Sequence, residues 1–233
     1  MFVFLDIGFT LIGGPNTGPA GRLIQELKLP QTAKPAINEL LFRTSLADPE
    51  DLADRITDKF RLDRSVALRC AKELWEKQCD EAYEIPGARN ALERLDEAGI
   101  SYGFISNIWA PFLQGFARLF PKEYKRCPVF ASYQRAAFKP DPQLYLIALK
   151  ETNTDPSQAI MIGDTYEMDI APAIKLGIKT VWTLHRPEKE HADLVQVLNN
   201  TAPKPDLTLE NITQLHPEQL NALIRPVAKE KIT

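Results

Sequence analysis

The chain has 233 residues, of which 44% are hydrophobic and 25% charged, and its formal net charge is −3. This length suits one sizeable α/β domain or a core domain with a smaller insertion. The sequence has no strongly basic stripe, so nucleic acid is not an expected partner. It has no apolar run near the ~18 residues of a membrane span and no signal-peptide pattern, so we expect no membrane partner and a cytoplasmic location.

The first predicted element is the apolar run FVFL at positions 2–5, which Asp6 follows directly. Periodicity alone does not separate a buried strand from a helix in so short a run. Gly8 and the Gly-Gly-Pro breaker at 13–15 come soon after and favour a strand that leads into a loop. The pattern therefore predicts a buried β-strand over residues 2–6, with the Asp6 carboxylate at its carboxyl end.

From about residue 19 to residue 84 the pattern is helical, most clearly over 64–83. Apolar residues recur there every four positions, from Val66 to Leu74, which predicts one apolar stripe along a helix. Asp63 precedes this segment and is a candidate N-cap. We expect no strand to interrupt this region.

Beyond the Pro-Gly pair at 86–87, helical and strand patterns alternate along the chain. The predicted helices cover 88–98, 142–151 and 169–176, and the predicted strands cover 101–105, 129–131, 159–162, 179–183 and 207–209. This alternation predicts a parallel sheet with helices on both faces. We expect the strand 207–209 at the sheet edge and residues 229–233 to form a fraying tail.

The fold class that follows is α/β: a Rossmann-like parallel sheet with helices on both faces, interrupted after its first strand by an inserted all-helical domain. We assign residues 1–16 and 86–233 to the core and residues 17–85 to the helical insertion. Open parallel sheets bind their ligands outside the carboxyl ends of the strands. The residues that follow each predicted strand are therefore the candidates for a functional site.

Polar side chains gather at these positions. They are Asp6 after the first strand, Ser106 and Asn107 after the strand 101–105, Lys139 before the helix 142–151, and Asp164 and Asp169 after the strand 159–162. The set combines three carboxylates, one ammonium, one hydroxyl and one amide. Such a group on one rim suits a divalent cation and a phosphoryl group.

In this order and at this spacing, the four motifs resemble those of the haloacid dehalogenase superfamily, over residues 2 to about 215. The helical insertion resembles the first-type (helical, C1) cap of that family. The resemblance implies a Mg²⁺-dependent phosphatase that acts on a small phosphorylated metabolite through an aspartyl-phosphate. A carboxylate nucleophile divides the hydrolysis into two steps and needs no general base of its own.

The resemblance also implies a role for each site residue. Asp6 would be the nucleophile and a metal ligand, together with the backbone carbonyl of Gly8 and the carboxylate of Asp164. Asp169 would hold a metal-bound water or brace Lys139, which would neutralise charge on the nucleophile and the phosphoryl oxygens. The neutral donors to the phosphoryl group would be Thr10, Ser106 and Asn107.

Gly8 departs from the pattern of phosphatases in this superfamily, which usually carry an acid/base aspartate at this position. Loss of a general acid/base costs ~10²–10⁴-fold in rate. Two alternatives therefore stay open: a 2-haloacid dehalogenase-type hydrolase, and a weakly active or inactive binding protein. The surplus carboxylates Asp164 and Asp169 favour phosphoryl chemistry with a cation over dehalogenation, because without one they would repel a carboxylate substrate.

Other conspicuous residues have simpler expected roles. Cys70, Trp75 and Trp182 are expected to pack in the interior. Trp109 is open between a wall of the substrate site and the core. The sequence does not identify the residues of the insertion that contact the substrate.

Overall fold

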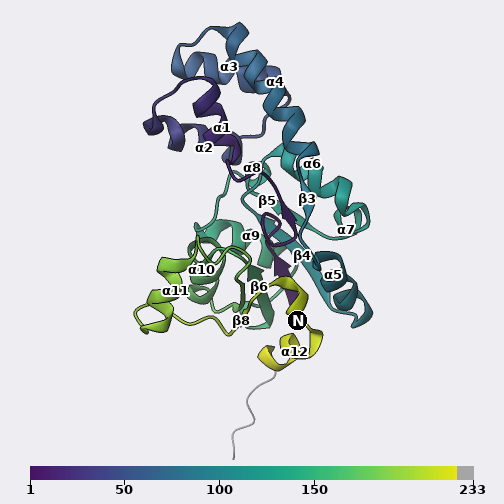
Figure 1. Ribbon diagram of the computed structural model, residues 1–233. Coiled ribbons are helices and arrows are strands. Elements are labelled where there is room, and N and C mark those ends of the chain that lie inside the picture. Colours follow the sequence, from purple (N-terminus) through teal and green to yellow (C-terminus); the bar gives the residue numbers. More distant parts are fainter. Residues whose placement is uncertain (225–233) are drawn as a thin grey trace, which may run out of the picture.

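The computed structural model describes residues 1–224, so the tail predicted at 229–233 lies outside the described residues. The core is a six-stranded sheet in the order β5-β4-β1-β6-β7-β8 (Figure 1). Its strands are β1 (Phe2–Leu5), β4 (Ser101–Ser106), β5 (Val129–Ala131), β6 (Ala159–Gly163), β7 (Lys179–Thr183) and β8 (Leu207–Leu209). Every pair is parallel, which confirms the predicted α/β class and the edge position of β8.

The first strand is central because it pairs with β4 on one side and β6 on the other. Leu5 lies opposite Phe104 of β4 and Ile162 of β6. The Asp6 amide donates to the Ile162 carbonyl at 2.9 Å, which extends the pairing to the end of the strand. This register brings the carboxyl ends of three strands together at one edge of the sheet.

Helices cover both faces of the sheet, as the alternating pattern predicts. They are α5 (Ala88–Glu97), α6 (Ala110–Leu119), α7 (Pro121–Arg126), α8 (Ser132–Arg135), α9 (Pro142–Glu151), α10 (Ala171–Lys175), α11 (His191–Leu198) and α12 (Pro217–Ile224). Because strand side chains alternate in direction, Val3 and Leu5 pack with α5, α6 and α12, whereas Phe4 packs with α9 and α10.

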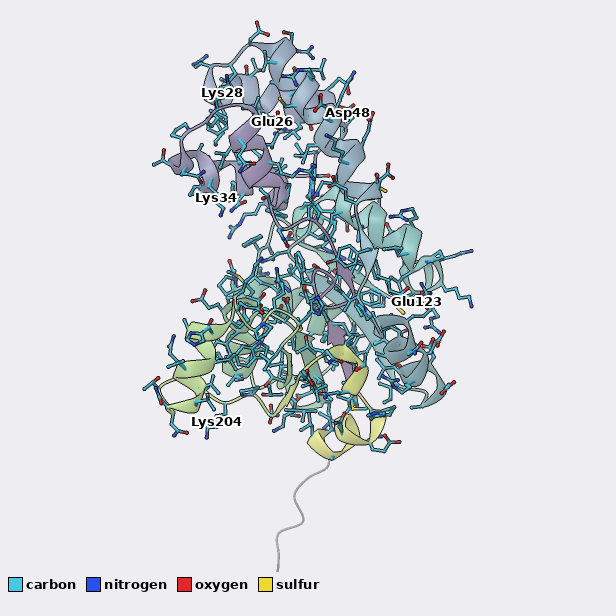
Figure 2. The ribbon with its side chains drawn as sticks, in the orientation of Figure 1. Glu26, Lys28, Lys34, Asp48, Glu123 and Lys204 are labelled. Carbon is cyan, nitrogen blue, oxygen red and sulfur yellow. The ribbon has the colours of Figure 1, made fainter. Side chains whose placement is uncertain are left out.

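A helical lobe stands apart from the sheet at the upper end of the molecule in Figure 1. It consists of α1 (Pro19–Glu26), α2 (Lys34–Arg43), α3 (Pro49–Phe60) and α4 (Arg64–Asp80). The lobe has its own buried hydrophobic cluster, in which Ile37, Leu52 and Ile56 are fully buried. Trp109, at the start of α6, is the one buried member of this cluster that the sheet domain contributes. The charged side chains of Glu26, Lys28, Lys34 and Asp48 are labelled on the lobe in Figure 2.

Helix α4 begins as predicted. Its N-cap is Asp63, whose side chain accepts from the amides of Ser65 and Val66. The predicted stripe is wrong at Val66, which is 40% exposed; the buried residues of this helix are Ala67, Cys70, Ala71, Leu74 and Gln78. The apolar face thus keeps the predicted Cys70 and Leu74 and includes Ala67 in place of Val66.

Two short-range predictions were also wrong. A two-residue strand, β3 (Tyr83–Glu84), follows α4 and pairs antiparallel with β2 (Ile12–Gly13). The segment predicted as a helix from 169 starts earlier, with the single π-helical turn η3 (Tyr166–Ile170). Both features depend on partners elsewhere in the fold, so local periodicity does not report them. Within residues 1–224 we find no helix with the length and apolar character to cross a membrane.

Gly115 sets the close approach of α6 to α4, and this contact joins the lobe to the sheet domain. A Cβ atom at Gly115 would lie 2.7 Å from the Ala82 Cβ and 3.1 Å from the Cys79 carbonyl oxygen. Overpacking costs about 1–3 kcal/mol, and the better helix propensity of alanine offsets about 1 kcal/mol of it.

We therefore expect Gly115→Ala to lower the free energy of unfolding by about 1 kcal/mol in urea titration. The control is Gly21→Ala in α1, where the near neighbour is a flexible threonine methyl group at 3.0 Å. That change is expected to be neutral or stabilising. Equal effects of the two substitutions would contradict the close packing at Gly115.

Candidate active site

The carboxyl ends of the central strands border a cavity of about 230 Å³ between the sheet and the helical lobe. Its polar and charged lining residues are Asp6, Gln78, Asn107, Lys139, Asp164, Thr165 and Arg186. Its apolar wall includes Phe9, Phe42, Trp109, Phe112 and Met168. Four of the predicted site side chains thus share one cavity wall, together with the backbone of Gly8.

The ammonium of Lys139 lies at the centre of the site and is 2% exposed. Its Nζ donates to Asp6 Oδ1 at 2.7 Å, to Asp169 Oδ1 at 2.5 Å and to the Ile105 carbonyl at 3.1 Å. An ammonium has three protons, so these acceptors use all of them. Lys139 therefore joins two carboxylates that would otherwise repel each other.

The charges of this cluster are mutually dependent. Burial by itself lowers the pKa of Lys139, but the carboxylates of Asp169 and Asp6 outweigh it and raise that pKa above its usual value. Burial raises the pKa of Asp169, and the Lys139 ammonium opposes that rise. The geometry favours an ionised pair, because a buried ammonium at 2.5 Å stabilises a carboxylate strongly.

The Asn107 side chain positions Lys139 by binding the Lys139 backbone. The side-chain Nδ2 of Asn107 donates to the Lys139 carbonyl at 2.8 Å, and its Oδ1 accepts from the Lys139 backbone amide at 2.8 Å. The peptide bond between Lys139 and Pro140 is cis. The side chain predicted as a donor to substrate is thus bonded to the backbone of Lys139, while it also forms part of the cavity wall.

Asp169 is braced at both oxygens. Oδ1 accepts from Lys139, and Oδ2 accepts from the Thr165 amide at 3.0 Å. Gly163 makes room for this carboxylate, because a Cβ there would lie 2.3 Å from Asp169 Cγ. Of the two roles that the resemblance implies for Asp169, these contacts match the bracing of Lys139.

A divalent cation fits the acidic part of the site by its chemistry. One carboxylate oxygen from each of Asp6, Asp164 and Asp169 lies within 4.8 Å of the others, and all three residues are buried. Oxygen atoms are the ligands that Mg²⁺ prefers. Asp169 has both oxygens in short hydrogen bonds, whereas Asp164 Oδ1 has only a 3.3 Å contact with the Thr165 hydroxyl and Asp6 Oδ2 has no partner within residues 1–224. Asp6 and Asp164 therefore offer the more available ligands, and Gly8 borders the same cavity.

Arg186 is a site residue that the sequence reasoning missed. Its Nε and Nη2 donate to Asp164 Oδ2 at 2.9 and 2.5 Å. Its guanidinium lies 3.6 Å from the ring centroid of Phe9, which has a left-handed φ of 57°. Burial raises the pKa of Asp164 to about 6, against the lowering effect of Arg186. Its place three residues after β7, at the same sheet edge, is the signal that could have indicated it.

Two predicted donors lie outside the cavity wall. Thr10 is 1% exposed, and its Oγ1 is buried without a hydrogen-bond partner among the described residues. Ser106 is also buried at the end of β4. Neither residue lines the cavity.

The helical lobe contributes one polar side chain to the cavity wall among the described residues, that of Gln78. It is 2% exposed, and its Oε1 accepts from the Trp109 indole Nε1 at 3.0 Å. Trp109 therefore belongs both to the lobe cluster and to the cavity wall, which confirms its burial in the core, whereas its place in a substrate site stays a prediction. Trp182 is fully buried and its indole donates to the Asp164 carbonyl, which confirms a packing role.

Comparison with known proteins connects this geometry to a family. A family model described as a haloacid dehalogenase-like hydrolase matches residues 20–177. The crystal structure of 2-haloacid dehalogenase from Pseudomonas syringae pv. Tomato DC3000 is similar in fold, with a TM-score of 0.62 and 23% identity over 95% of this chain and 98% of that one. CbbY from Rhodobacter sphaeroides, solved with phosphate, has a TM-score of 0.60 and 16% identity over 94% and 98% of the chains. At these identities the likeness shows the fold.

Sequence comparison finds named phosphatases. The chain is 34% identical over 124 residues to glyceraldehyde 3-phosphate phosphatase of Pyrococcus furiosus, covering 48% of this chain and 50% of that protein. It is 30% identical over 125 residues to ribulose-1,5-bisphosphate 5-phosphatase of Halopiger xanaduensis, covering 53% and 51%. The chain thus spans about half the length of the curated relatives it matches.

The bracing of Asp169 gives a prediction for Gly163. In Gly163→Ala, the added methyl group must displace the Asp169 carboxylate and with it the Lys139 ammonium. A misplacement of about 1 Å can cost ~10²-fold in rate. We expect a loss of that order in kcat for whatever reaction the wild-type protein catalyses. The control is Gly18→Ala, where a Cβ meets nothing within 4 Å; full activity in Gly163→Ala would contradict the bracing role.

Proposed function

This chain belongs to the haloacid dehalogenase-like hydrolases, and from that premise we propose that it is a Mg²⁺-dependent phosphatase that acts on a small phosphorylated metabolite. The observation that carries the proposal is the buried Asp6 carboxylate, paired with Lys139 at 2.7 Å on the wall of the cavity. The relatives are named as phosphatases of phosphorylated sugars, which supports a small phosphorylated metabolite as the substrate. A cytoplasmic location and the absence of nucleic-acid and membrane partners stay predictions.

In the proposed reaction the Asp6 carboxylate is the nucleophile. Oδ1 is engaged by Lys139, and the second oxygen, Oδ2, lies near Gly8 at the cavity. A carboxylate oxygen attacks phosphorus, the bond from phosphorus to the leaving oxygen breaks, and the leaving oxygen takes a proton from water. Water then attacks the aspartyl-phosphate, which releases inorganic phosphate and restores the carboxylate.

Lys139 has two tasks in this scheme. Its ammonium holds the Asp6 carboxylate in place and supplies positive charge beside the transferred group. Asp169 and Asn107 are positioning residues, because they fix Nζ and the backbone of Lys139 respectively. Ser106 and Thr10 remain proposed donors to the phosphoryl oxygens.

The proposed cation is Mg²⁺, held by Asp6, by Asp164 and by the backbone carbonyl of Gly8, with Asp169 close by. A bound cation would reduce the repulsion between the nucleophile and an anionic substrate. The clustering of three buried carboxylates supports the proposal, since such a group is costly without a compensating charge. For Asp164, this compensation comes from Arg186 in the ligand-free protein.

We also propose that the helical lobe, residues 17–85, is a cap of the helical type over the core formed by residues 1–16 and 86–233. Its separate hydrophobic cluster and its contribution of Phe42 and Gln78 to the cavity wall support this division. A cap that closes over the substrate excludes water from the reacting groups.

The central test is the Asp6→Asn variant, which keeps the shape and the acceptor for Lys139 but lacks the nucleophilic charge. Removal of a nucleophile can cost up to ~10⁶-fold in kcat. We expect turnover of p-nitrophenyl phosphate and of sugar phosphates to vanish in the variant and, for the wild type, to depend on added Mg²⁺. A phosphoryl adduct at Asp6, trapped by acid quench and located by mass spectrometry, is the direct readout.

Metal-independent turnover, or full activity of the Asp6→Asn variant, would refute the proposal. Halide release from 2-haloacids in the presence of a chelator would identify a dehalogenase instead. Tight Mg²⁺ binding with no turnover on a broad panel would favour the binding protein, the candidate that Gly8 suggests.

Gly8 provides a second prediction because the structure has space at this position. A Cβ there would lie 3.8 Å from Phe112 Cε1 and 4.0 Å from Asp6 Oδ2, which are ordinary contact distances. If the missing acid limits turnover, Gly8→Asp should raise kcat on esters with poor leaving groups by up to ~10²-fold, the lower range for a general acid. Gly8→Ala is the matched control for the added Cβ, and a lack of gain relative to it would count against this account.

A further inference from the structure

We propose that Gln78 of helix α4 is a specificity-determining residue whose side-chain amide donates a hydrogen bond to an uncharged oxygen of the leaving group. This inference rests on the proposed phosphatase function and names the class of substrate that the site accepts. The substrate would carry one phosphate and a short, neutral leaving group with a carbonyl or hydroxyl oxygen.

The Trp109 indole fixes the orientation of the Gln78 side-chain amide. The indole Nε1 of Trp109 is a donor only, so the atom that faces it at 3.0 Å must be the oxygen of Gln78. The contact therefore fixes which end of the amide points elsewhere. That end is Nε2, which carries two protons and cannot accept a hydrogen bond.

The Nε2 atom of Gln78 has no partner in the described protein. No hydrogen-bond partner for it occurs within residues 1–224, although Gln78 is 2% exposed. Nε2 is not sealed in the interior, since the sealed side-chain atoms without partners in this part of the chain are Thr10 Oγ1, Thr57 Oγ1 and Glu123 Oε2. The residue lines the cavity that also contains Asp6. The unpaired donor is thus available to a molecule bound there.

The charges on the cavity wall favour an uncharged leaving group. The cations that line the cavity are Lys139 and Arg186, and both are engaged by carboxylates. The lobe adds none: Lys28 and Lys34, labelled on the lobe in Figure 2, are not lining residues. Among the described residues that line the cavity, a second phosphate or a carboxylate on the leaving group would therefore meet no unpaired cation. Lys189, whose Nζ lies 5.4 Å from the centroid of the Phe9 ring, is not a lining residue. The neutral donor of Gln78 matches an uncharged oxygen instead.

The volume of the cavity limits the length of the leaving group. The cavity volume of about 230 Å³ lies below the ~300–1,000 Å³ that is typical of small-molecule sites. A phosphoryl group fills part of this space, so the leaving group must be short. Phe42, Trp109 and Phe112 supply an apolar wall for its carbon atoms.

The test uses phosphonates, which cannot be hydrolysed, in matched pairs: 2-oxopropylphosphonate against propylphosphonate, and 3-oxobutylphosphonate against butylphosphonate. A ketone oxygen only accepts, so the pair reports a donor on the protein. Inhibition constants are measured against p-nitrophenyl phosphate turnover with Mg²⁺ at pH 8. We expect the wild type to prefer the ketone in at least one pair by roughly 3- to 10-fold, the range for one neutral hydrogen bond.

Two variants remove the donor in different ways. Gln78→Glu keeps an oxygen for the Trp109 indole but presents a carboxylate to the cavity, and Gln78→Met removes both interactions. We expect the ketone preference to disappear in both, while the melting temperature falls mainly in Gln78→Met. Gln25→Glu, on the exposed side of α1, is the matched control and should keep the preference.

A wild-type ratio near one in both pairs, or a ratio that the two variants leave unchanged, would overturn the inference. In that case Gln78 only satisfies the Trp109 indole. Binding of the same phosphonates by calorimetry separates the two proposals: absent turnover with a ketone preference abolished in the variants would refute the phosphatase and keep the ligand contact. No binding of any phosphonate would overturn both.

Discussion

Three carboxylates, from Asp6, Asp164 and Asp169, lie buried at one edge of the sheet, and the ammonium of Lys139 makes this arrangement tolerable. Charges that leave water lose several kcal/mol of solvation each unless partners replace it. The Lys139 ammonium replaces the lost solvation of both Asp6 and Asp169, and its third proton is donated to a main-chain carbonyl. The chemistry proposed for Asp6 depends on this contact, because it decides where the nucleophile lies and which of its oxygens stays available.

Three further features of the fold fix the position of Lys139. The parallel register of β1, β4 and β6 brings the strand ends together, and Asn107 fixes the backbone of Lys139 with two hydrogen bonds. The absence of a side chain at Gly163 leaves room for the Asp169 carboxylate. Strand pairing, the position of the loop and side-chain contacts together fix this site, so a shift at any of these positions also moves the Asp6 carboxylate.

The helical lobe meets this site through a polar contact between apolar surfaces. Trp109 inserts into the hydrophobic cluster of the lobe, and its indole proton is satisfied by Gln78 of α4. The same contact leaves Nε2 of Gln78, a residue of the cavity wall, without a partner within residues 1–224. On the opposite side, Arg186 stacks on Phe9 and pairs with Asp164. The described wall of the cavity is therefore rich in aromatic surface but has no unpaired cation, which fits the small, neutral leaving group that we propose.

The amino-acid sequence by itself determined the α/β class, most strands and core helices, the N-cap at Asp63 and the grouping of Asp6, Lys139 and Asp164, because breakers, periodicity and strand-end positions are local signals. It did not determine that Asn107 binds the backbone of Lys139, that Arg186 pairs with Asp164 across 22 positions, or that β2 pairs with β3. It also missed the exposure of Val66 and the amide of Gln78, which a tryptophan 31 positions away orients. These features arise from contacts between distant segments, so only the tertiary structure decided them.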